Sequence, residues 1–224
     1  MLAEYRSPKS KSADRHRGEA PKDVIMDFLS DKDVWGCCDV DDLWIYDKLI
    51  LARKLGHLAG PAGVPVPSNG FYMVRPITNI RMMSRGAYKA WLSPVSDTVP
   101  DGYFWSELFQ GRHISIDYNF GEQKTTVEGI RNSARLDRFY KWQRVEYSYE
   151  LPAVLQDVAK RSKWLNIEMV GDKIIEVHLR YNDDFLNHNC NEIFPVWKNE
   201  WNSRPSGSEW YDSPCGDRLG FWIR

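Results

Sequence analysis

Two alternating segments near the C-terminal end constrain the fold of this chain more than any other feature. In WLNIEMVGDKIIEVHLR, residues 164–180, apolar and mainly polar side chains alternate on both sides of Gly171-Asp172. A period of two is typical of a β-strand with one buried face. The two segments are therefore predicted to form a β-hairpin.

The register of this hairpin follows from its apolar face. A two-residue turn at Gly171-Asp172 would pair Glu168 with Ile175 and mix the two faces. A three-residue loop, 171–173, keeps the apolar side chains together, so we expect it. The expected cross-strand pairs are Val170 with Ile174, Glu168 with Glu176, Ile167 with Val177, and Asn166 with His178.

The pairing of Glu168 with Glu176 has a chemical consequence. Carboxylates on directly opposed residues, with Cβ atoms about 5 Å apart, repel one another. Either one of them holds a proton or a cation lies between them, and Mg²⁺ suits carboxylate oxygens. His178 and Arg180 extend the same face and could reach phosphate oxygens. The alternative is that this face is exposed and its charges are hydrated.

The order of the other predicted elements indicates a mostly antiparallel α+β fold, because strands neighbour strands along the chain. The N-terminal residues 1–22 are polar and are expected to form a flexible arm. The C-terminal residues 200–224 are expected to wrap the surface. The predicted elements between them are a helix at 42–55, a strand at 71–77, paired strands at 103–110 and 112–120, strands in QKTTVEGIRNS and KWQRVEYSYEL, a helix from Pro152, and the hairpin.

Composition narrows the class of protein. Lys plus Arg number 30 and Asp plus Glu 31, a balance that argues against an obligate nucleic-acid binder. No apolar run reaches the length of a membrane span, and the N-terminus has no signal-peptide pattern. A cytoplasmic protein with reduced thiols is expected.

The second strand of the hairpin resembles the closing motif of the ATP-grasp family. That motif reads roughly E-x-N-x-R after an upstream acidic residue, and it holds the Mg²⁺ of MgATP. Here the residues are Glu176, His178 and Arg180, with Glu168 upstream. His178 stands where the family has Asn, and imidazole is a poorer Mg²⁺ ligand than an amide oxygen.

Three further stretches are similar to ATP-grasp motifs and occur in the family's order. Asp47-Lys48, followed by a helix and then GVPVP, resembles the family's lysine-bearing helix. MVRP, at 73–76, resembles the strand whose basic residue contacts ATP phosphates, with Arg75 in place of the usual Lys. Arg can bind phosphate as a planar fork.

SELFQGRHISIDY, at 106–118, resembles the hinge that binds the adenine edge through its backbone. Glu107, Leu108 and Phe109 would lie at this hinge, and His113 replaces the Glu that usually grips the ribose.

The resemblance covers about residues 42–182 and implies a single ATP-grasp-like domain, 23–199. Its two small lobes would span about 40–102 and 103–199. The substrate domain that usually precedes the core is not recognisable, so a partner protein could supply it.

The resemblance leaves two functions open. The first is a ligase dependent on ATP and Mg²⁺ that activates a small carboxylate as an acylphosphate for attack by an amine. Lys48, Arg75 and Arg180 would contact phosphates, with Arg75 and Arg180 catalytic, and Glu168, Glu176 and His178 would hold the metal. The second is a binding or assembly protein without catalysis, as a viral or accessory protein could be. The substitutions at Arg75, His113 and His178 favour the second.

Overall fold

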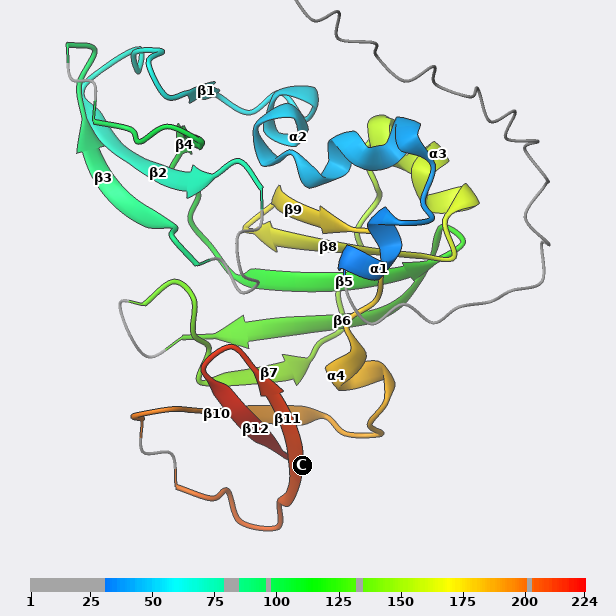
Figure 1. Cartoon of the computed structure of the whole chain (residues 1–224). Helices are drawn as coiled ribbons and strands as arrows, with labels where there is room; N and C mark the ends of the chain where they lie inside the picture. The colour runs from blue at the N-terminus through cyan, green and yellow to red at the C-terminus, as the bar shows by residue number, and fades with distance from the viewer. Residues whose placement is uncertain (1–30, 79–84, 96–97, 132–134, 201–202) are drawn as a thin grey trace, which may run out of the picture.

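Two antiparallel sheets form the framework of the molecule (Figure 1). The computed structural model describes residues 31–78, 85–95, 98–131, 135–200 and 203–224. The N-terminal arm expected at 1–22 lies outside these residues. No helix among the described residues is long and apolar enough to cross a membrane.

The smaller sheet has four strands in the order β1-β4-β2-β3. They are β1 (Ala59–Pro61), β2 (Gly70–Pro76), β3 (Tyr88–Leu92) and β4 (Tyr103–Glu107). Val66, Tyr72, Val74, Leu92 and Trp105 form its apolar core. Gly60 allows β1 to pair with β4, because a Cβ at this position would lie 2.6 Å from the Trp105 ring.

The larger sheet has eight strands in the order β11-β12-β10-β7-β6-β5-β8-β9. All the strand pairs of both sheets are antiparallel, which confirms the predicted fold class. The strands are β5 (His113–Asn119), β6 (Glu122–Ile130), β7 (Lys141–Arg144), β8 (Trp164–Val170), β9 (Lys173–His178), β10 (Glu192–Trp197), β11 (Glu209–Cys215) and β12 (Arg218–Ile223).

The predicted strand pairing around Gly111 is wrong. β4 belongs to the smaller sheet, whereas β5 pairs with β6 and β8 in the larger one. The segment between β4 and β5 therefore connects two sheets instead of turning a hairpin. Alternation identifies each strand from local sequence, but the choice of partner depends on distant residues.

The C-terminal residues do not wrap the surface as expected. β11 and β12 form an antiparallel hairpin that extends the larger sheet beyond β10 (Figure 1). Phe221 of β12 packs with Phe185, Ile193 and Val127 in a separate apolar cluster. Burial of these aromatic side chains gives the hairpin a stabilising role in the sheet.

Helices lie on both faces of the larger sheet. They are α1 (Asp31–Trp35), the 3-10 helix η1 (Val40–Tyr46), α2 (Lys48–Lys54), α3 (Ala153–Arg161) and α4 (Asp183–Leu186). The first four cover the face that includes Ile116 of β5 and Ile167 of β8, and α4 lies against the other face, where its Phe185 packs with Val127. Ile45 and Leu51 pack with Leu155 of α3 and with Ile167 of β8 in the main core. η1 and α2 thus pack against the larger sheet, whereas the smaller sheet has an apolar core of its own.

The helix predicted at 42–55 is interrupted at Asp47. This residue has extended backbone angles, φ −88° and ψ 101°, and its carboxylate accepts a hydrogen bond from Ile50 N at 2.8 Å. An aspartate at this position caps α2, because it satisfies an amide that has no partner within the helix. Lys48 therefore becomes the first residue of α2.

The late hairpin has three of the four predicted pairs and a different turn. Asn166 lies opposite His178, Ile167 opposite Val177, and Glu168 opposite Glu176. The loop has two residues, since Val170 pairs with Lys173, and a β-bulge between Glu168 and Met169 takes up the extra residue. The expected three-residue loop is wrong, but the bulge achieves the same separation of faces.

Candidate functional site

A cavity of about 250 Å³ lies where the two sheets meet. The smaller sheet contributes Met73, Arg75, Ser106 and Glu107, and the larger sheet contributes His113, Val170 and Ile175. The connection between β4 and β5 closes one side. The remaining lining residues are Ala87, Leu108, Phe109, Gln110, Gly111, Arg131 and Leu136. The structure thus brings together all the hinge residues predicted from sequence, together with Arg75 and His113.

The hinge crosses closely over the β8–β9 turn. Gly111 has φ 127°, and a Cβ there would lie 2.7 Å from the Cα of Gly171. Gly171 has φ 64°, and a Cβ there would lie 2.6 Å from the carbonyl oxygen of Gln110. Both positions require glycine, because a side chain would push the hinge away from the turn. Leu108–Gln110 lie outside both flanking strands.

Glu107 lines the cavity, but its carboxylate is bonded to the backbone of the segment before β1. Its Oε1 accepts a hydrogen bond from Leu58 N at 3.2 Å, and its own amide donates to Leu58 O at 3.0 Å. These two bonds hold the segment before β1 against the end of β4. Glu107 therefore fixes the start of the hinge.

Arg75 is buried, with 7% of its surface exposed. Its Nη1 donates to Ile175 O of β9 at 3.0 Å, and its guanidinium lies over the Phe104 ring at 5.0 Å. Burial lowers the pKa of Arg75, and the nearby charges of Glu176 and Glu168 offset only part of this effect. A guanidinium in such surroundings gains from an anionic ligand.

Arg131 is a cavity residue that sequence reasoning missed. It follows β6, and its guanidinium stacks on Phe139 at 3.9 Å from the ring centroid. Its Nη2 donates to Leu136 O at 3.0 Å and lies 3.4 Å from His113 Nδ1. Nothing in the local sequence GIRNS marks it, since its position depends on the fold around β6 and residues 135–139.

Three buried polar atoms at this cavity have no hydrogen-bond partner within the described part of the chain. They are Arg75 Nε, Arg131 Nε and Ser106 Oγ. Buried donors are nearly always satisfied in proteins, so such a group of donors at one cavity indicates a ligand with acceptor atoms. The chemistry that satisfies two guanidinium groups and a hydroxyl is that of an oxyanion.

His113 lines the cavity and packs edge-on against both Phe139 and Trp142. Its Nε2 is 3.2 Å from Glu168 Oε2. Since an arginine can only donate, Nδ1 is the acceptor for Arg131 and Nε2 carries the hydrogen that Glu168 accepts. His113 therefore links the cavity to the acidic pair and does not stand free to grip a ribose.

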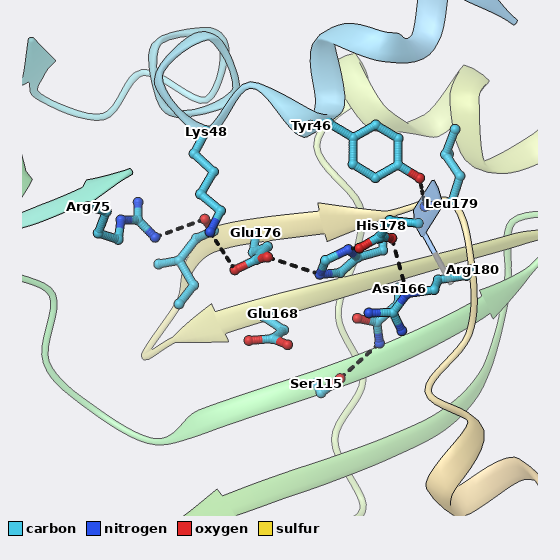
Figure 2. A network of polar contacts seen from close by, with 12 residues as sticks. Tyr46, Lys48, Arg75, Ser115, Asn166, Glu168, Glu176, His178, Leu179 and Arg180 are labelled. Atoms are coloured by element: carbon cyan, nitrogen blue, oxygen red, sulfur yellow. Dashed lines mark hydrogen bonds and ion pairs between the residues drawn. The ribbon is translucent and has the colours of Figure 1, made fainter. Parts of the chain in front are cut away.

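The acidic pair lies on β8 and β9, as the register predicts, but protein cations are its partners (Figure 2). Lys48 Nζ is 3.2 Å from Glu176 Oε2, and these side chains are only 5% and 8% exposed. The Nε2 of His178 is 3.2 Å from the other oxygen of Glu176. Burial and Glu176 favour protonation of Glu168, yet the hydrogen bond from His113 keeps the pKa of Glu168 below its usual value.

His178 is a cation at neutral pH. Its Nδ1 lies 3.0 Å from Asp31 Oδ1, so both ring nitrogens face carboxylates. Burial and the charge of Arg180 lower the pKa of His178, but the hydrogen bonds with Asp31 and Glu176 outweigh them and raise it to about 9. Asp31 has no counterpart in the motifs read from sequence, because 147 residues separate it from His178.

Arg180 does not extend toward a phosphate. Its Nε donates to Asp31 Oδ1 at 3.1 Å, and its Nη1 donates to Tyr181 O at 3.2 Å. Arg180, His178 and the acidic pair line a second cavity of about 300 Å³, which the C-terminal hairpin closes through Ser213–Cys215 and Arg218. Arg85 pairs with Asp217 at 3.1 Å.

The residues expected to hold Mg²⁺ do not fit the ion. Within the described ranges, no group of three or more His, Cys, Asp or Glu side chains is arranged to hold a metal. Both oxygens of Glu176 face protein cations, and a doubly protonated imidazole has no lone pair for a metal. The expected repulsion between the two glutamates is relieved by Lys48, His113 and His178 instead.

No protein-family model matches the chain, and no curated protein matches its sequence. The solved structures that resemble it include ATP-grasp proteins. A protein assigned to the ATP-grasp superfamily from Archaeoglobus fulgidus is 16% identical with a TM-score of 0.46, over 80% of this chain and 64% of that one. The L-amino acid ligase from Bacillus licheniformis is 12% identical with a TM-score of 0.42, over 63% and 41% of the two chains.

The D-alanine–D-alanine ligase from Bacillus anthracis, complexed with ATP, is 17% identical with a TM-score of 0.34, over 60% of this chain and 55% of that one. The chain therefore spans less than two thirds of the length of each of these proteins. At such identities and TM-scores, functional inference depends on the side chains of this chain.

Proposed function

We propose that this protein binds an adenine nucleotide, with ATP the form that the sequence motifs imply, in the cavity between the two sheets. The observation that carries the proposal is the set of unsatisfied buried donors on Arg75, Arg131 and Ser106. Two guanidinium groups and a hydroxyl suit the phosphate end of the ligand. The hinge, Leu108–Gln110, offers backbone groups outside the sheet ladders to a planar base.

Of the two functions expected from sequence, the binding or assembly role is better supported than the ligase. Formation of an acylphosphate needs the transferred phosphoryl group to be neutralised by a metal held at Glu168 and Glu176. These carboxylates already face Lys48, His113 and His178. The expected small carboxylate substrate depends on ligase activity, and so does the partner protein that would supply a substrate domain. Both are therefore supported no better than the ligase.

The test is nucleotide binding by the full chain. Isothermal titration calorimetry with ATP should give saturable binding, and Arg75→Met should weaken it at least about tenfold, equivalent to about 1.4 kcal/mol. Arg112→Met is the matched control, because Arg112 is an exposed arginine beside the hinge that pairs with Glu128 outside the cavity. Absence of ATP binding at millimolar concentration, or equal affinity of Arg75→Met and the wild type, would refute the proposal.

A further inference from the structure

The charged groups at the acidic end of the site balance one another. Six carboxylates line the second cavity, and three of them, on Asp31, Glu168 and Glu176, meet cations or histidine there. Lys48, His178 and Arg180 supply three cations in direct contact with Asp31 and Glu176, and His113 hydrogen-bonds Glu168. The formal charges of these three carboxylates and three cations therefore sum to zero.

Glu176 is held from both sides. Lys48 approaches Oε2 at 3.2 Å from the first turn of α2, and His178 approaches Oε1 at 3.2 Å from the same strand, β9 (Figure 2). A divalent ion at Glu176 would lie beside two buried cations that already contact this carboxylate. Displacing either cation would break a buried ion pair and leave that cation with less compensation for its desolvation, which is unfavourable.

His178 occupies the position at which the ATP-grasp motif has an amide. An amide oxygen can accept a metal, whereas a ring with both nitrogens against carboxylate oxygens must donate from both. Entry of a divalent ion would also place two positive charges against Lys48 and His178, which already contact Glu176. The donor set, the occupied oxygens and the charge balance all disfavour Mg²⁺ at this position.

We infer that the protein binds its nucleotide without a divalent metal, with Lys48 and His178 standing where the ATP-grasp motif would place Mg²⁺. The inference rests on the proposed nucleotide-binding function and defines the ligand as the metal-free nucleotide. Arg75 and Arg131 then neutralise phosphate charge that a metal would otherwise carry.

The first test compares ATP binding by the full wild-type chain in EDTA and in excess Mg²⁺. We expect affinity in EDTA to equal or exceed the affinity in Mg²⁺. Binding at least about tenfold tighter in Mg²⁺ would overturn the inference and leave the nucleotide-binding proposal standing. No binding in either buffer would overturn both. Electron paramagnetic resonance of Mn²⁺ provides a readout independent of affinity: addition of the protein should leave the spectrum of Mn²⁺ with ATP unchanged.

The second test restores the family residue. His178→Asn should introduce a requirement for Mg²⁺, seen as at least about tenfold tighter ATP binding with Mg²⁺ than with EDTA. His188→Asn is the matched control, because His188 packs on Tyr211 and Phe221 away from both cavities and should leave the wild-type behaviour unchanged. A folded His178→Asn variant that stays indifferent to Mg²⁺ would contradict the assignment. If the variant does not fold, the wild-type comparison decides alone.

Discussion

The contact between Lys48 and Glu176 can be tested as a buried ion pair. At 3.2 Å the Coulomb attraction is about 5 kcal/mol for an effective dielectric constant of about 20. Breaking such a pair by removing one partner costs about 3–5 kcal/mol, because the remaining charge stays buried. His178 remains beside Glu176, so we expect Lys48→Met to lower the free energy of unfolding by about 3 kcal/mol, at the lower end of that range.

A double-mutant cycle separates the pair from the loss of packing. Glu176→Gln removes the charge with little change of shape, so Lys48→Met in that background should cost much less. We expect an interaction energy of about 2–3 kcal/mol from urea unfolding of the four proteins at pH 7. The matched control is Lys173→Met, which breaks an exposed contact with Asp172 at 3.1 Å and should cost less than about 1 kcal/mol.

Additive effects of the two substitutions would refute this reasoning. They would mean that Lys48 does not neutralise Glu176 in the folded protein, and the charge balance of the acidic end would then be wrong. A loss as small as that of the Lys173→Met control would carry the same meaning. Unequal urea m-values among the four proteins would need correction before the comparison, since they report changes in exposed surface on unfolding.

Three other predictions concern pH and backbone. Because the folded pKa of His178 is raised to about 9, its stabilisation is complete below the unfolded value of about 6.5 and is lost as pH rises through 9. The urea concentration at the unfolding midpoint of the wild type should therefore approach that of His178→Asn as pH is raised above about 9. Burial raises the pKa of Asp117 to about 6. Ionisation of this carboxyl therefore destabilises the folded protein progressively as pH rises from about 4 to 6. Asp117→Asn should raise the free energy of unfolding at pH 7 by about 1–2 kcal/mol. A variant less stable than the wild type at pH 7 would contradict this. Gly111→Ala should lower the free energy of unfolding by about 1–3 kcal/mol, because the added methyl group would clash with Gly171. The loss should exceed that of Gly207→Ala, since Gly207 has φ 73° but open space around it. Equal melting temperatures of the two variants would show that the hinge tolerates displacement.

The sequence predicts the strands well because alternation is a local property. β2, β5, β8 and β9 begin within about two residues of the predicted positions, and the opposition of Glu168 and Glu176 follows from face segregation alone. The bulge after Glu168 was not predictable from the same rule. A three-residue loop and a two-residue turn with a bulge separate the faces equally well, and only the geometry of the turn distinguishes them.

The parts of the site that sequence could not predict come from distant segments. Asp31, in a five-residue helix, meets His178 across 147 residues, and Arg131 reaches His113 only because β6 pairs with β5. Lys48, His113 and His178 contact the acidic pair, whereas the sequence motifs predict contacts with ATP or Mg²⁺ for them. A single sequence shows which charges exist and not which of them satisfy one another.

Arg75 shows how ligand binding and the arrangement of the sheets are connected in this molecule. The apolar cores of the two sheets are separate clusters, and Arg75 of β2 reaches across to Ile175 O of β9. Its Nε lies buried at the cavity without a partner in the described part of the chain. A ligand oxyanion that accepts from this atom would thereby be joined to β9 through the same guanidinium. The group proposed to bind the ligand is also a polar link between the sheets, so we expect occupation of the cavity to change how firmly the two sheets are held together.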